Sequence, residues 1–437
     1  MDCCLYLSAG QAAAVAAATA AAWMLARAAL WPRQDKVLRG PLHPARRTLM
    51  VMSDSNGSAE KSTGGFVVLD TDAEELVGLP HNEDIFPGAR DVSTPYGSVR
   101  VYEFGPEDGP KVLFVHGITT SCMPFTPLAH ALVARGCRVM LFDLFGRGLS
   151  DGVGDLPHDA RLYSSRICEL ASSPLSWMGD GAFRLIGYSL GGALALAFAN
   201  SFPRLVSSLV MLAPAGLIRL DARSTAARVL FSASAVPDRL AASLASFRLR
   251  SPIAMSSPSA PPQQRGNHVA SDEPVQKAFV AVAAAEAEFA SVHRGHFRPD
   301  EKNGVGIGSG ADADDEDRRR AIALLEDRVS ESVSWMIDNH AGFVPAFLSC
   351  IRSAPLTDQH DSWRRIARRP AGSTAVLLAE FDDLIDAQLY TRHGLALAGG
   401  SGHVVWRVLP GNHDFVMTHS DHIIRELDNL WAMTPPV

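Results

Sequence analysis

Cysteine is scarce in this sequence, and none of it falls into a metal-binding or disulfide-rich arrangement. Six cysteines are spread over 437 residues, whereas small secreted domains that depend on disulfides are far richer in cysteine. No two cysteines form a CxxC pair, and none has a histidine at a spacing typical of a zinc site. We therefore expect free, mostly buried thiols and no metal site.

An excess of basic residues is missing as well. The chain has 40 lysines and arginines against 47 aspartates and glutamates, which gives a net charge of −7 at pH 7. Proteins that bind nucleic acids concentrate positive charge on the binding surface, and no such stripe is present in the sequence. We therefore expect no nucleic-acid partner. The hydrophobic share of 47% is that of a globular protein with a sizeable core.

Charge is absent altogether between Cys3 and Ala26, where residues 12–22 are nearly all alanine. This stretch is long enough to cross a bilayer as a helix, and the basic residues from Arg27 onward favour a cytoplasmic location for the region after the helix. We therefore predict a membrane-associated protein with a single transmembrane helix in residues 1–34. A mitochondrial presequence and a cleaved secretory signal stay open as alternatives.

Beyond this segment the sequence predicts a flexible linker and then an α/β fold. Small, polar residues at 52–65 mark the end of a linker over residues 35–65. From residue 66, short apolar runs typical of buried strands alternate with helical patterns, which predicts βαβ units and a mostly parallel sheet with helices on both faces. The expected strands are 97–104, 111–115, 138–142, 183–186, 208–213, 374–379 and 403–409.

The alternation of strands and helices stops after Gly216 and resumes near Thr374. Helical patterns dominate between these positions, interrupted by two polar stretches, 251–274 and 303–317, whose composition is typical of disordered loops. We therefore predict a core in two parts, residues 66–215 and 371–437. A helical cap at residues 216–370 is inserted between them.

A glycine-flanked serine lies where a predicted strand meets a predicted helix. The residues Gly187-Tyr-Ser-Leu-Gly191 form the G-x-S-x-G pattern, in which a tight turn exposes the serine at the edge of the sheet. The glycines let the neighbouring backbones approach each other, and the first N–H groups of the helix point toward the serine. Ser189 is the candidate nucleophile.

A serine hydroxyl needs a base to accept its proton and an acid to orient that base. Asp382 follows the strand 374–379 and His413 follows the strand 403–409, at the carboxyl ends where α/β sheets place their sites. We predict His413 as the base and Asp382 as its acid, and the adjacent Asp383 stays open as an alternative. The predicted oxyanion donors are the backbone N–H groups of Leu190 and of Ile118 after strand 111–115, with Gly117 expected to permit an unusual turn.

Taken together, these motifs resemble the α/β-hydrolase fold superfamily, specifically serine hydrolases of the esterase and lipase type with a helical cap. The resemblance is carried by VHGI (115–118), FDLFGRGLSDG (142–152), GYSLGG (187–192), EFDD (380–383) and GNHD (411–414). It implies structural turns at Asp143, Gly146, Gly148 and Ser150. Where the family often has a glycine before the acid-bearing loop, this chain has Ala379, which leaves the choice between the two aspartates open.

A serine at this turn implies an acyl-enzyme and the hydrolysis of an ester, thioester, lactone or amide, with no cofactor. A small-molecule or lipid-like ester, such as a monoacylglycerol, is our hypothesis for the substrate. An amidase or aminopeptidase-like hydrolase and a non-catalytic, membrane-tethered binding protein stay open. The sequence does not determine the oligomeric state.

Apolar cap residues are candidates to line a groove or to pack against the core: Trp335, Met336, Phe343, Val344, Phe347 and Leu348.

Overall fold

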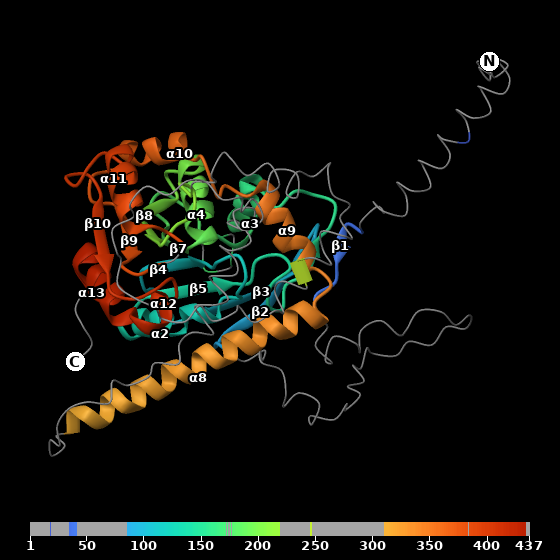
Figure 1. Ribbon diagram of the computed structural model, residues 1–437, viewed down its shortest axis with the longest axis horizontal. Helices are drawn as coiled ribbons and strands as arrows, with labels where there is room; N and C mark the ends of the chain where they lie inside the picture. The colour runs from blue at the N-terminus through green and yellow to red at the C-terminus, as the bar shows by residue number, and fades with distance from the viewer. Residues whose placement is uncertain are drawn as a thin grey trace, which may run out of the picture.

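The computed structural model describes residues 35–41, 85–218 except 172, 174 and 176, 245–246, 310–433 except 383, and Ala18. An eight-stranded sheet lies at its centre, with the strand order β10-β9-β8-β7-β4-β5-β3-β2 (Figure 1). The strands are β2 (Ala89–Thr94), β3 (Gly97–Phe104), β4 (Lys111–Val115), β5 (Arg138–Phe142), β7 (Phe183–Tyr188), β8 (Val206–Leu212), β9 (Thr374–Ala379) and β10 (Val405–Leu409).

All neighbouring strands from β5 to β10 pair in parallel, and β3 near one edge pairs antiparallel with both β2 and β5. The parallel strands are runs of buried apolar residues, as expected for strands that are covered on both faces. The predicted α/β fold with a mostly parallel sheet is confirmed. The strand 89–94 was not predicted, and β10 begins at Val405 rather than at 403.

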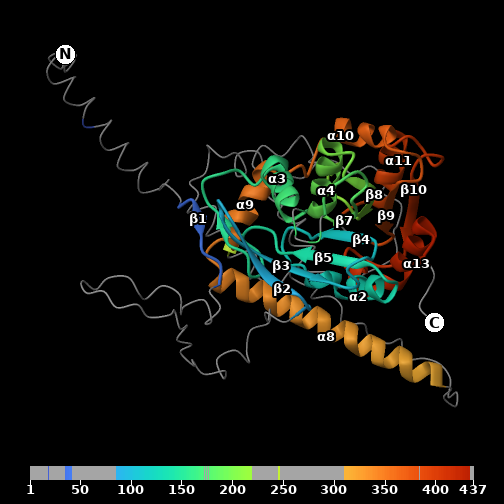
Figure 2. The ribbon, with the colours of Figure 1, turned by 180° about the vertical axis from the view of Figure 1, so that it is seen from behind.

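Helices cover both faces of the sheet (Figures 1 and 2). One layer holds α3 (Ala160–Ala171), α4 (Leu190–Ser201), α10 (His360–Arg364) and α11 (Ala387–Leu397), and the other holds α2 (Thr126–Ala134), α12 (Phe415–Thr418) and α13 (Ser420–Trp431). Both layers pack on one continuous core of buried side chains. Because the strands are parallel, their carboxyl ends meet at one edge of this covered sheet.

Besides α10, which packs in the first of these layers, two longer helices belong to the segment that the sequence predicts as a cap. The long helix α8 (Gly310–Asn339) contacts α12 and the short helix η3 (Met123–Phe125), and α9 (Phe343–Ser353) follows it. Residues 310–317, predicted to belong to a disordered loop, instead form the start of α8. Most of the predicted cap, residues 219–309 except 245–246, lies outside the described residues, as does the linker from residue 42 onward, so the division into core and cap stays a prediction.

The apolar residues named for the predicted cap pack mainly into the core. Five of the six candidates for a groove are buried in the core cluster, and Trp335 is partly buried against it. Their role in the structure is therefore packing, the second of the two roles considered for them.

The prediction of a membrane-associated chain with one transmembrane helix was wrong. None of the helices in the described part of the chain combines the length and the apolar character that a bilayer crossing requires. The prediction was based on the alanine-rich segment 1–34, which, apart from Ala18, lies outside the described residues.

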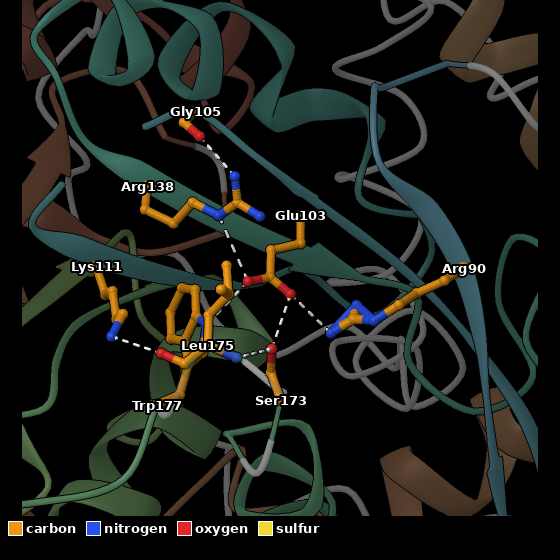
Figure 3. Close-up of polar contacts among 8 residues, drawn as sticks. All are labelled: Arg90, Glu103, Gly105, Lys111, Arg138, Ser173, Leu175 and Trp177. Carbon is orange, nitrogen blue, oxygen red and sulfur yellow. Dashed lines mark hydrogen bonds and ion pairs between the residues drawn. The ribbon is translucent and has the colours of Figure 1, made fainter. Parts of the chain in front are cut away.

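A buried glutamate joins the strands at the amino edge of the sheet, opposite the ends where the candidate site lies. Glu103 on β3 accepts hydrogen bonds from Arg90 on β2 (2.8 Å), Arg138 on β5 (3.4 Å), Ser173 (3.1 Å) and Trp177 (3.1 Å), as Figure 3 shows. Its side chain is only 7% exposed, so both arginines compensate a charge that is largely shielded from water. This cluster connects the antiparallel edge to the parallel part of the sheet.

Candidate active site

Ser189 lies at the junction of β7 and α4 in a conformation that few residues adopt. Its backbone has φ 54° and ψ −120°, and it is one of four non-glycine residues with positive φ among those described. Such backbone strain costs about 1–3 kcal/mol and is concentrated at functional sites. The turn is held by two backbone hydrogen bonds, from Ser189 N–H to the carbonyl of Leu212 (2.9 Å) and from Ala215 N–H to the carbonyl of Ser189 (3.0 Å).

The two glycines that flank Ser189 permit this turn because no side chain would fit in their place. A Cβ on Gly191 would lie 2.0 Å from the carbonyl oxygen of Val115, and a Cβ on Gly187 would lie 2.2 Å from that of Gly191. The strand β4, the strand β7 and the start of α4 are therefore closer together than any alanine would allow. This is the close approach that the sequence pattern predicts.

The structure brings together the three side chains predicted as nucleophile, base and acid. His413 Nε2 lies 3.1 Å from Ser189 Oγ, and His413 Nδ1 lies 2.7 Å from Asp382 Oδ2. A carboxylate only accepts hydrogen bonds, so Nδ1 carries the proton and Nε2 is the acceptor that faces the serine hydroxyl. All three side chains are nearly inaccessible to water.

Backbone and neighbouring groups fix the orientation of this pair. The other carboxylate oxygen of Asp382 accepts hydrogen bonds from the N–H groups of Leu384 and Ile385, both at 2.8 Å. The hydroxyl of Tyr188 donates to the carbonyl of His413 (2.8 Å). Asp383, the alternative acid, lies outside the described residues.

The loop after β4 carries the first predicted oxyanion donor, and a histidine of the same loop orients it. The N–H of Leu144 donates to His116 Nε2 (2.8 Å), so the proton is on Nδ1, which donates to the carbonyl of Gly117 (2.9 Å). Gly117 itself has no positive φ, so this residue does not adopt the left-handed conformation that favours glycine. The side chain of His116, which is fully buried, holds the peptide between Gly117 and Ile118 instead.

The second predicted donor, Leu190, is the first residue of α4. The first N–H groups of a helix have no acceptor within the helix, and the dipole of the helix makes this end electropositive. Leu190 therefore directly follows Ser189 in a position that suits an anion. Ile118 and Leu190 are both buried.

Asp143, Gly148 and Ser150 form a tight turn after β5, as the resemblance implied. Asp143 accepts backbone hydrogen bonds from Cys122 and Leu149, and the hydroxyl of Ser150 donates to the carbonyl of Asp143 (2.7 Å). Gly148 has φ 51°, and a Cβ there would lie 2.1 Å from the Asp143 carboxylate. This turn supports the loop that carries Ile118.

Two acidic residues near His413 were not predicted. Asp414 is the next residue, and burial raises its pKa to about 6, against the lowering effect of His413. Glu326, on α8, is 5% exposed, and burial together with the nearby Asp414 raises its pKa to about 8. A glutamate in a helical pattern is ordinarily a surface residue, so only the packing of α8 against α12 could reveal this pair.

The described part of the chain contains no group of three or more histidine, cysteine, aspartate or glutamate side chains that could hold a metal ion. The candidate site consists of a hydroxyl, an imidazole, a carboxylate and backbone N–H groups. This arrangement is suited to nucleophilic attack on a carbonyl group.

Comparisons with known proteins agree with this geometry. Residues 107–287 match the family described as serine aminopeptidase, S33. Lipase LipV of Mycobacterium tuberculosis is 32% identical over 142 residues, which are 32% of this chain and 50% of the relative. Monoglyceride lipase of Mus musculus is 29% identical over 122 residues, 28% of this chain and 40% of the relative. The chain thus spans half or less of the length of these relatives.

A solved structure of a candidate lipase from Acinetobacter baumannii AYE superimposes on 84% of this chain and 98% of its own. The TM-score is 0.51 and the sequence identity is 15%, so the similarity concerns the fold.

Proposed function

We propose that this chain, which belongs to the α/β-hydrolase superfamily, is a serine hydrolase that cleaves carboxylic esters through an acyl-enzyme. Its similarity to two lipases and to the serine aminopeptidase family supports a hydrolase. The observation that carries the more specific proposal is the continuous contact from Asp382 through His413 to Ser189. An imidazole held between a carboxylate and a hydroxyl activates that hydroxyl as a nucleophile.

In the proposed mechanism, Ser189 Oγ attacks the carbonyl carbon of the ester while His413 Nε2 accepts the hydroxyl proton. Asp382 stabilises the imidazolium that forms. The N–H groups of Ile118 and Leu190 bind the oxyanion, a contribution of about 3 kcal/mol for each donor. His413 then donates its proton to the departing alcohol, and afterwards it activates a water molecule that releases the acid from Ser189.

We propose a small-molecule or lipid-like ester as the substrate. This is supported by the similarity to proteins named as lipases, one of them a monoglyceride lipase. The test is hydrolysis of a series of esters with increasing acyl length, including monoacylglycerols, by the full chain. Activity that is confined to short, soluble esters would reject the lipid-like substrate while leaving the ester hydrolase in place.

The proposed nucleophile is tested by covalent labelling with a fluorophosphonate probe. We expect the wild-type chain to be labelled and to hydrolyse esters, and Ser189→Ala to do neither. A folded wild-type chain that is neither labelled nor active on any ester contradicts the proposal.

A second candidate function is cleavage of an amide or peptide bond. The match of residues 107–287 to the serine aminopeptidase family favours it, and the same three side chains serve both reactions. Rates on a proline arylamide and on a matched aryl ester distinguish the two functions, because an aminopeptidase would prefer the amide with a free amine.

A further inference from the structure

We propose that Arg147 is a positioning residue for the oxyanion-binding loop, and that through Cys350 it ties this loop to helix α9. The proposal rests on the function proposed above, because it assigns Ile118 N–H as an oxyanion donor. The side chain of Arg147 donates to the backbone carbonyl of Ile118 in that loop, so its effect would be transmitted through the backbone of the loop.

Arg147 is fully buried, and its guanidinium group is directed at the loop on one side and at α9 on the other. Its Nε donates to the carbonyl of Ile118 (2.9 Å), and its Nη1 donates to the carbonyl of Phe145 (2.8 Å). On the far side, Nη1 lies 3.4 Å from the hydroxyl of Tyr163, and Nη2 lies 3.4 Å from Sγ of Cys350. One side chain thereby connects the loop after β4, the turn after β5, helix α3 and helix α9.

Both peptide groups beside the Cα of Ile118 are held by side chains. His116 binds the carbonyl of Gly117, which belongs to the same peptide as Ile118 N–H, and Arg147 binds the carbonyl of Ile118 itself. In a trans peptide the C=O and N–H groups point in opposite directions, so a fixed Gly117 carbonyl fixes the direction of the N–H. With the next peptide also fixed, the loop cannot turn this N–H away.

Such rigidity matters for catalysis because an oxyanion donor is effective only when it is already aligned as the charge develops. A displacement of about 1 Å at a reacting group can cost about 100-fold in rate. Substrate binding before the reaction does not depend on this alignment to the same degree. Loss of Arg147 should therefore lower kcat much more than it changes KM.

A buried guanidinium needs polar partners on each side, and Cys350 provides one of them. Burial by itself raises the pKa of the Cys350 thiol, but the charge of Arg147 together with His158 and Tyr163 lowers this pKa overall. Nη2 of Arg147 donates to Sγ of Cys350 at 3.4 Å, where water does not screen the attraction between the sulfur and the guanidinium. Helix α9 thus contributes to the position of Arg147 although it holds none of the proposed catalytic residues.

Arginine is required here because several donors act in different directions at once. The guanidinium presents five donors in a rigid plane, whereas a lysine ammonium is a single flexible point of charge. We therefore expect Arg147→Lys to keep the charge but lose the hold on Ile118.

The experiment measures kcat and KM on an aryl ester, and the rate of fluorophosphonate labelling of Ser189, for Arg147→Lys, Arg147→Met and Cys350→Ser in the full chain. We expect kcat and the labelling rate to fall about 10- to 100-fold in both Arg147 variants. KM should stay within about twofold of the wild type. Cys350→Ser should give a smaller loss in the same direction.

Arg369→Met is the matched control. Arg369 is also buried and binds a backbone carbonyl, that of Val206 (3.0 Å), as well as Thr374 Oγ1 (3.1 Å), but it does so at the amino edge of the sheet. This variant should lose stability without the selective loss of kcat. The proposal is overturned if Arg147→Lys, which keeps the charge, retains the wild-type kcat, or if kcat falls only as much in the Arg147 variants as in Arg369→Met.

The part of the proposal that concerns α9 is overturned separately if Cys350→Ser has the wild-type kcat and labelling rate. If Arg147→Met does not fold, Arg147→Lys and Cys350→Ser decide the outcome. Failure of the proposed function has a different signature, because the wild-type chain itself would then be unlabelled and inactive. If the wild-type chain is labelled and the Arg147 variants have the same kcat as the wild type, only the role of Arg147 is rejected and the proposed function stands.

Discussion

His413 Nδ1 lies 2.7 Å from one carboxylate oxygen of Asp382, while the other oxygen accepts two backbone hydrogen bonds from the loop after β9. The carboxylate is thus held from both sides and its side chain is fully buried. A fixed acid allows only one tautomer of the imidazole, the one whose unprotonated nitrogen faces Ser189.

Asp382→Asn should preserve the geometry of the site but reverse the tautomer of His413. The amide NH₂ would donate to Nδ1 and leave the imidazole proton on Nε2. A protonated Nε2 cannot accept the proton of the Ser189 hydroxyl. We expect kcat on an aryl ester to fall about 10⁴-fold at neutral pH, with KM little changed. A loss below about 10-fold would show that Asp382 is not the acid, and Asp383→Asn would then be the variant to measure.

Ser189→Gly should abolish activity and yet stabilise the chain. Glycine adopts φ 54° at little cost, so the variant removes backbone strain that serine has at this turn. We expect the free energy of unfolding in urea to rise by about 1 kcal/mol relative to Ser189→Ala, which removes the hydroxyl but keeps the strain. A glycine variant less stable than the alanine variant would mean that the turn stores no strain.

Gly191→Ala should be strongly destabilising, because the new Cβ would lie 2.0 Å from the carbonyl oxygen of Val115, a backbone atom that cannot move aside. We expect a loss of about 3 kcal/mol or more in the free energy of unfolding, measured by urea denaturation. Gly402→Ala is the control, since a Cβ there meets no atom within 4 Å. Equal stability of the two variants would contradict the close packing of α4 on the sheet.

Glu326 should make the stability of the chain fall with rising pH. Burial and Asp414 raise its pKa from 4.5 to about 8, so between these values the folded chain keeps a proton that the unfolded chain releases. Stability is therefore lost as pH rises through this window. Glu326→Gln has no charge to bury, and we expect it to exceed the wild type by roughly 1–4 kcal/mol at pH 9 and to match it near pH 4.5.

The measurement for Glu326 is urea denaturation at several pH values. Glu331→Gln is the matched control, because Glu331 lies on the exposed face of the same helix. A difference between wild type and Glu326→Gln that does not grow with pH would show that the carboxyl group is ionised throughout.

The sequence allowed the parallel strands and the relative positions of Ser189, Asp382 and His413 to be predicted, because each residue follows a recognisable strand and parallel strands end at one edge. The contact of Arg147 with Cys350 joins residues 203 positions apart, and no periodicity or local motif reports on such a pair. The burial of Glu326 likewise depends on how α8 packs. The transmembrane prediction failed because length and absence of charge were its main support, although alanine is only weakly apolar.

The positive φ of Ser189 also restricts which nucleophiles could evolve at this position. A side chain branched at Cβ is a steric outlier at positive φ, so threonine is disfavoured there even though it offers the same hydroxyl. Cysteine and aspartate are unbranched at Cβ and are nucleophiles in their own right. The turn therefore restricts the shape of the side chain at position 189 more than its functional group. A descendant of this chain could acquire a new reaction by replacing that one functional group on an unchanged backbone.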